Sequence, residues 1–185
     1  MTNFNLAHLP VYIIDEQKLS RYSNYMAALG NRPDLFPNSL YPYASTLLEF
    51  LRYPIPPEYL SDETFAAMIY EAEKHLGRPY VWGGSNPSTS FDCSGFVSWV
   101  VNHSGWSFGR LTAQELFEVC VPVSPENAIP GDLIFFKGTY KTTGASHVGI
   151  YVGDNMMLHC GNPISYAPTN TTFWIDHFYC YGRLT

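Results

Sequence analysis

The stretch FDCSGFVSWV, residues 91–100, opens with Asp-Cys-Ser-Gly and continues as an apolar run of the kind that fills a protein core. Phe96 and Val100 repeat at the spacing of one helix face, which predicts a helix with a buried side. Asp92 is a residue type that caps helix starts, so Cys93 is predicted to be the first helical residue. A cysteine in this place is either a buried core thiol or a nucleophile, and the rest of the chain has to separate the two interpretations.

The predicted position of Cys93 suits a nucleophile, because the unpaired N–H groups and the dipole of a helix start favour a thiolate. A free thiol has a pKa of about 8.5, so a cysteine that works at neutral pH needs this help or a neighbouring imidazole. Ser94 and Gly95 are small and are expected to let a substrate approach closely. The backbone N–H of Cys93 is a candidate donor to a developing oxyanion.

The composition indicates a globular protein, since 46% of the 185 residues are hydrophobic and 14% are charged. The net charge of −6 offers no basic surface, so nucleic acid is not an expected partner. No stretch approaches the ~20 apolar residues of a membrane span. The cysteines form no CxxC pair, which argues against a zinc site. Reduced thiols are favoured, with a Cys160–Cys180 disulfide left open; the four cysteines are Cys93, Cys120, Cys160 and Cys180.

Residues 1–60 differ from the rest, because they hold half of the chain's 14 tyrosines and half of its 14 prolines. Apolar spacing over residues 19–29 predicts a helix, and the prolines of RYPIPPEY (52–59) predict an extended linker. So many large aromatic side chains imply that this segment packs against another part of the protein. Residues 1–60 are therefore predicted to be a mainly helical extension packed on a second domain, residues 61–185.

In the second domain, the spacing of apolar residues changes from helical in its first part to strand-like in its second part. Residues 61–76 predict a helix with Ser61 as its N-cap, and the helix that begins at Cys93 follows. The later apolar runs are short and separated by turn residues, as in strands; they cover residues 132–136, 147–153, 155–160 and 174–182. Helices followed by strands predict an α+β fold with an antiparallel sheet.

Two histidines lie twelve positions apart in the strand-like part. A three-residue hairpin loop over residues 153–155 would pair Gly149 with His159 and place His147 one pair away diagonally, on the same face of the sheet. A two-residue loop would place the two histidines on opposite faces. The first arrangement allows His147 to act as a base, with His159 hydrogen-bonded to its far nitrogen as the orienting group.

Five short motifs, in order, resemble the NlpC family of cell-wall cysteine peptidases over about residues 63–182; they are GRPYVWGG (77–84), FDCSGFV (91–97), PGDLIFF (130–136), HVGIYVG (147–153) and MMLHC (156–160). The resemblance implies a papain-like α+β fold in which the nucleophile heads a helix that packs on an antiparallel sheet. It also implies a catalytic triad in which Cys93 is the nucleophile, His147 the base and His159 the third member.

The resemblance further implies the substrate and the chemistry. Family members hydrolyse peptidoglycan stem peptides, most often between γ-D-glutamate and a diamino acid, through a thioester and without a metal or organic cofactor. Tyr80 matches a tyrosine that lines the family's pocket, and Trp82 stands beside it, with plain aromatic packing as the alternative for both. Asp92 and Ser94 match positions that some relatives use to bind the free amine of a trimmed stem, with helix capping as the alternative for Asp92.

Other functions and settings stay open at this point. The same Cys–His–His fold serves amidases and lipid acyltransferases, and a catalytically inactive binding module is a third possibility. The start of the chain has no signal-peptide pattern. The stretch GNRPDLFP (30–37) resembles the region before the peptidase domain in hydrolases of conjugative elements, where a membrane anchor and a muramidase domain can come first. We therefore expect an extracellular or cell-wall location, as part of a longer exported or anchored protein.

Overall fold

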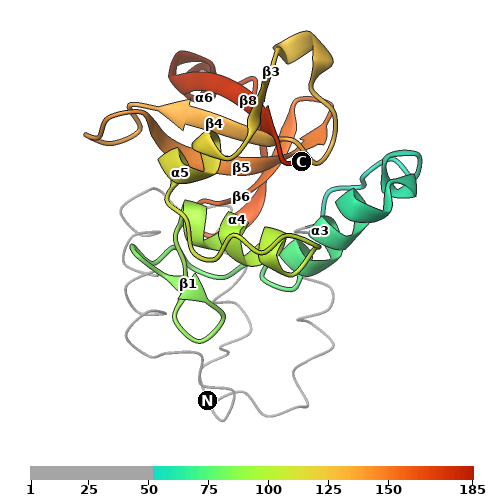
Figure 1. Ribbon diagram of the computed structural model, residues 1–185, viewed down its shortest axis with the longest axis horizontal. Coiled ribbons are helices and arrows are strands. Elements are labelled where there is room, and N and C mark those ends of the chain that lie inside the picture. Colours follow the sequence, from blue (N-terminus) through green and yellow to red (C-terminus); the bar gives the residue numbers. More distant parts are fainter. Residues whose placement is uncertain (1–51) are drawn as a thin grey trace, which may run out of the picture. The chain divides into compact units, whose positions relative to one another are not determined.

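The computed structural model describes residues 52–185 (Figure 1). Nearly all of the predicted extension, residues 1–51, lies outside the described residues, and its helix and packing stay predictions. The described end of that segment has no helix or strand before the short 3-10 helix η5 (Tyr59–Ser61), as its prolines predict. Ile55 is buried, and the Tyr53 ring lies 5.7 Å from that of Tyr166.

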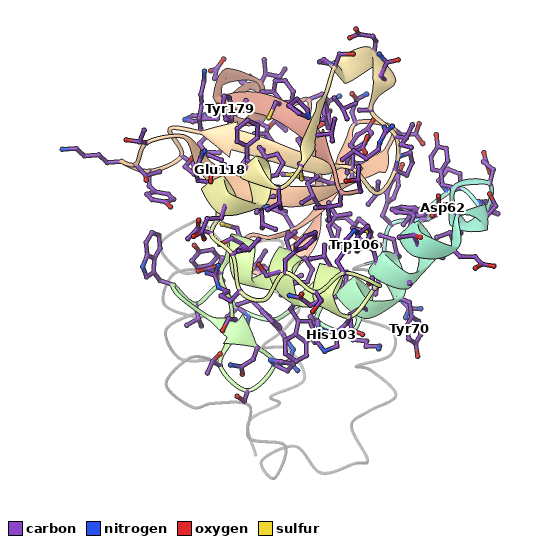
Figure 2. All side chains as sticks on the ribbon, viewed as in Figure 1. Asp62, Tyr70, His103, Trp106, Glu118 and Tyr179 are labelled. Carbon is purple, nitrogen blue, oxygen red and sulfur yellow. The ribbon has the colours of Figure 1, made fainter. Side chains whose placement is uncertain are left out.

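Helix α3 (Glu63–Glu73) is the predicted helix of residues 61–76, shortened at both ends. Ser61 is not its N-cap. Asp62 takes that place, because its side chain accepts a hydrogen bond of 2.8 Å from the backbone N–H of Phe65, while the Ser61 hydroxyl donates to the carbonyl of Glu58. The apolar residues Phe65, Met68, Ile69 and Ala72 of α3 are buried, whereas Tyr70 is 72% exposed on the outer side of the helix (Figure 2).

Helix α4 (Cys93–Asn102) begins at Cys93, as predicted, with Asp92 as its N-cap. The Asp92 side chain accepts a 2.7 Å hydrogen bond from the backbone N–H of Gly95. The rings of Phe91 and Phe96, on either side of the cap, meet edge to face at 6.0 Å and fix the entry of the chain into the helix. Helix α5 (Ala113–Glu118) follows and begins with a capping box.

A six-stranded antiparallel sheet forms the centre of the domain and confirms the predicted fold class (Figure 1). Its strand order is β3-β8-β4-β5-β6-β7, and a two-stranded β1-β2 ribbon precedes α4. The strands are β1 (Ser85–Asn86), β2 (Ser90–Phe91), β3 (Val121–Val123), β4 (Leu133–Lys137), β5 (Ala145–Gly153), β6 (Met156–Cys160), β7 (Ile164–Pro168) and β8 (Phe178–Arg183). A 3-10 helix, η6 (Pro125–Asn127), follows β3.

The two faces of the sheet carry different partners. Helix α4 packs on β5 and β6, whereas the short helix α6 (Thr172–His177) packs on β4. Cys160 faces α4, since its sulfur lies 3.2 Å from the carbonyl of Phe91, and its neighbour His159 therefore faces the other way. In Figure 1, α4 and α6 accordingly lie on opposite sides of the sheet.

The predicted strand over residues 174–182 is half wrong. Residues 172–177 form α6, and only the second half of that run continues as β8. The reason is a local cap that starts the helix: the Thr171 hydroxyl accepts from the backbone N–H of Trp174, and its carbonyl accepts from that of Ile175. Strands β4, β5 and β6 lie close to their predicted positions.

The β5–β6 hairpin reaches the predicted register by a different route. Its loop has two residues, Asp154 and Asn155, both with positive φ, instead of the predicted three. An irregularity in β5 between Tyr151 and Gly153 adds one residue to that strand. The bulge cancels the shorter loop, so Gly149 still pairs with His159.

Candidate active site

His147 on β5 and His159 on β6 lie on the same face of the sheet, the arrangement expected for a three-residue loop and reached here through a two-residue loop and a bulge. Their rings stand 5.0 Å apart between centroids and nearly perpendicular, and Nε2 of His147 lies 2.8 Å from Nδ1 of His159. Both side chains are buried. The pair is thus held at hydrogen-bonding distance, with one nitrogen of each ring committed to the other.

Two glycines leave room for this pair. Gly149 lies directly across from His159, and a Cβ at Gly149 would stand 3.1 Å from the Cβ of His159. A Cβ at Gly161 would stand 2.9 Å from Cε1 and 3.0 Å from Nε2 of the same ring. Any larger side chain at Gly161 would therefore push the His159 ring out of its position.

Cys93 lies against the strand that carries the first histidine. It is the first residue of α4, which packs on β5, and its side chain is buried. The backbone N–H of Val148 is near enough to act on the sulfur as a hydrogen-bond donor. Val148 directly follows His147, so the thiol lies beside the segment from which the imidazole projects.

Burial sets the protonation of these groups. It raises the pKa of the Cys93 thiol to about 11, with Asp92 adding to the rise, while the N–H of Val148 opposes it. Burial lowers the pKa of His159 to about 4, and burial together with His159 lowers the pKa of His147 well below its usual value. Burial thus opposes the thiolate that the helix start is expected to favour, and it favours a neutral thiol beside neutral imidazoles.

Asp92 is the centre of a hydrogen-bond network at the start of α4. It accepts from the N–H groups of Gly95 and Gly83 and from the hydroxyl of Ser94. Arg110 joins it through Nη2 at 3.0 and 2.8 Å and also donates to Ser94. These contacts fill the roughly four acceptor positions of a carboxylate. The network favours the capping role of Asp92, and amine binding by Asp92 and Ser94 stays a prediction that would require Arg110 to move.

The small size of Gly95 has a different cause from the one expected. A Cβ there would collide with the carbonyl of Gly84, because the loop before β1 packs directly against the first turn of α4. The space beside Gly95 is therefore taken by the protein's own backbone and is not open to a substrate. This close approach explains why a glycine follows Cys93 and Ser94.

Two tyrosines, Tyr80 and Tyr140, lie within electrostatic reach of the cysteine, and Trp82 contacts one of them. Burial raises the pKa of the Tyr80 phenol, and Cys93 and Asp92 add to the effect, which places Tyr80 within electrostatic reach of the thiol. Trp82 is 71% exposed and meets Tyr140 edge to face at 5.1 Å. Burial and then Cys93 raise the pKa of Tyr140 as well. Their roles in substrate binding stay predictions.

Across residues 52–185, no three His, Cys, Asp or Glu side chains are grouped so that they could hold a metal ion. Cys93, Cys120, Cys160 and Cys180 are all free thiols. In the same described part, no helix has the length and apolar character needed to cross a membrane.

Sequence reasoning missed one side chain beside the histidines. Trp174 on α6 has its ring centroid 5.2 Å from that of His147 and 5.3 Å from that of His159. Because the sequence around it resembles a strand, nothing in the pattern indicated that a helix would bring it over the histidine pair. The link between Arg110 and Asp92 has no sequence signal either.

Comparison with known proteins gives this site a context. The chain is 40% identical over 131 residues to the bifunctional muramidase/DL-endopeptidase CwlT of Bacillus subtilis, covering 70% of this chain and 40% of that protein. It is 46% identical over 86 residues to the gamma-DL-glutamyl hydrolase of Bacillus subtilis, covering 46% of this chain and 21% of that protein. The chain thus spans less than half the length of these relatives.

A solved structure and a family model extend the comparison. The crystal structure of a lipoprotein-like NLP/P60 family protein from Staphylococcus aureus aligns with a TM-score of 0.64 and 31% identity, over 92% of this chain and 62% of that one. The model of the NlpC/P60 family matches residues 77–183, which is more than half of the chain. The chain belongs to the NlpC/P60 family.

Proposed function

We propose that this protein is a cysteine endopeptidase that hydrolyses peptidoglycan stem peptides, with Cys93 as nucleophile, His147 as base and His159 as the orienting group. The observation that carries the proposal is the 2.8 Å contact between His147 and His159, the first of which lies on β5, the strand on which the helix of Cys93 packs. A nucleophile, a base and an orienting group are the elements of a catalytic triad, and the approach of Cys93 to His147 is part of the proposal. The endopeptidase and hydrolase names of the relatives support the same reaction class.

The proton path follows from the histidine contact. Because Nε2 of His147 faces His159, Nδ1 is the nitrogen of His147 that is left to take the proton of the thiol. In the neutral pair, Nε2–H of His147 donates to Nδ1 of His159, which fixes the ring for that task. The raised pKa of Cys93 means that the proton leaves only as the sulfur attacks, with His147 as general base.

The remaining steps are those of acyl transfer. The sulfur attacks the scissile carbonyl, and the first N–H groups of α4, which lack partners inside the helix, include the Cys93 N–H as a donor to the oxyanion. His147 then gives its proton to the leaving amine, and a thioester remains on Cys93. Water, deprotonated by His147, attacks the thioester, releases the acid and restores the thiol.

We assign the bond between γ-D-glutamate and the diamino acid as the target. The support is the similarity to a DL-endopeptidase and a gamma-DL-glutamyl hydrolase. Tyr80 and Trp82 are assigned to the substrate-binding surface, because Tyr80 lies within electrostatic reach of the thiol and Trp82 is exposed. We place the reaction outside the cell, in the wall, and the chain within a longer exported or anchored protein.

Digestion of purified peptidoglycan, with the products identified by mass, tests this proposal. The wild type is expected to release fragments that end in γ-D-glutamate, whereas Cys93→Ala releases none. His147→Ala should lose at least ~10²-fold in rate, the scale of a positioned general base. Release of whole stems would indicate an amidase instead, and equal activity of Cys93→Ala would refute the mechanism. Binding of wall by the wild type without any cleavage would indicate an inactive binding module.

A further inference from the structure

Trp174 is the only aromatic residue of the described chain whose ring lies within 6 Å of both histidine rings, measured between centroids. Its plane is tilted by 31° from that of His147, with 5.2 Å between the two ring centroids. Its plane is perpendicular to that of His159, at 89°. One side chain thus contacts the two partners of the central hydrogen bond.

The position of Trp174 is fixed by side chains of the sheet beneath it and by the cap of α6. Its ring lies 4.5 Å from that of Phe136, and it packs on a buried cluster of the sheet formed by Ile134, Phe136, Met157 and Tyr181. Its backbone N–H is held by the cap of α6. Trp174 itself is partly buried, whereas His147 and His159 are 9% and 6% exposed. The partly exposed indole therefore packs against the buried imidazole pair from the side of α6.

The geometry points to Trp174 as a positioning residue that shields the His147–His159 hydrogen bond from water and keeps the His147 ring neutral and aligned. Water that reached the pair would compete for the shared proton, and it would hydrate and thereby favour an imidazolium. A base that is already protonated cannot accept the thiol proton. The kinetic part of this inference rests on the proposed function, whereas the shielding itself does not.

The other titratable groups around His147 limit the alternatives. The elements packed around β5 carry His159 on β6, Cys93 at the start of α4, Glu115 and Glu118 on α5, Lys137 on β4, and Asp176 and His177 on α6, which packs on β4. Asp176 is exposed, Lys137 lies over the Tyr179 ring, and His177 stacks on Phe173. Burial, followed by His159, is what lowers the pKa of His147. Exposure of the pair by loss of the indole should therefore move this pKa upward.

The test compares Trp174→Ala and Trp174→Phe with Ile175→Ala, a matched control on the same helix whose side chain is 60% exposed. The first readout is the NMR signal of the imidazole proton shared by His147 and His159, which requires no substrate. The wild type and Ile175→Ala should show a slowly exchanging signal. Exchange should be at least about tenfold faster in Trp174→Ala and intermediate in Trp174→Phe.

The second readout is the pH profile of hydrolysis. In Trp174→Ala, kcat should fall about tenfold or more with KM nearly unchanged, and the acid limb of kcat/KM should move up towards 6.5, the pKa of a hydrated imidazole. Trp174→Phe should recover most of kcat. A purely structural role would lower the melting temperature without moving the acid limb.

The two readouts separate the shielding by Trp174 from the proposed catalytic mechanism. If the shared proton in the wild type exchanges as fast as that of an exposed imidazole, the shielding is refuted, and this measurement stands even if Trp174→Ala does not fold. The same proton exchange in Trp174→Ala and wild type would refute it as well. Slow exchange together with full activity of Cys93→Ala would uphold the shielding and overturn the proposed mechanism instead.

Discussion

The buried histidine pair predicts a specific loss of stability in acid. The pKa of His159 falls to about 4 on folding because the ring is buried, from about 6.5 in the unfolded chain. The folded protein therefore binds fewer protons than the unfolded one between these two values, and its stability declines as the pH falls through this window. At about 1.4 kcal/mol per pH unit, His159 alone should cost about 3 kcal/mol by pH 4.

Urea unfolding at intervals between pH 7.5 and 4 measures this cost. A loss of about 3 kcal/mol is large against the 5–15 kcal/mol by which domains are stable. His159→Asn lacks the titrating ring, so its free energy of unfolding should fall less steeply, and this free energy minus that of the wild type should rise as the pH falls from 6.5 to 4. His103→Asn is the control, because His103 is exposed at the end of α4 (Figure 2). Identical slopes for the wild type and His159→Asn would refute the argument.

Three further outcomes follow from contacts near the site. Arg110→Gln should lower the free energy of unfolding in urea by about 1–2 kcal/mol, because the largely buried Asp92 carboxylate loses its charged partner; no loss would mean that solvent replaces it fully. Gly161→Ala should lower kcat about tenfold or more, with a melting temperature close to that of the wild type, because the new Cβ displaces the His159 ring; unchanged kcat would show that the ring need not stay there. Alkylation of Cys93 by iodoacetamide should be slow at pH 6 and accelerate as the pH rises towards 11, and equal rates at pH 6 and 9 would contradict a buried neutral thiol.

Much of the fold and of the histidine placement was predictable because it depends on local rules. The cap at Asp92 and the helical spacing after it fixed the start of α4 at Cys93. The alternation of side chains along strands, together with an expected three-residue loop, predicted that His147 and His159 share a face. Even the error in loop length was harmless, since a bulge restored the register.

The features that escaped prediction depend on contacts between distant segments or on competing local signals. Residues 174–182 are apolar and aromatic like a strand, yet the Thr171 cap starts a helix that carries Trp174 over the histidines. The Asp92–Arg110 pair joins residues 18 positions apart through tertiary packing. The pKa of Cys93 depends on how deeply the thiol is buried, which outweighs the helix start in the structure.

The central claim is that Cys93 forms a covalent acyl intermediate with the help of His147. Acid-quench mass spectrometry tests it directly, on protein mixed with a peptide that contains a γ-D-glutamyl–diamino acid bond. The account predicts a transient gain in protein mass equal to the acyl fragment, mapped to Cys93, absent in Cys93→Ala and formed at least ~10²-fold more slowly in His147→Ala. Hydrolysis of the peptide with no adduct on Cys93, at an undiminished rate in Cys93→Ala, would contradict it.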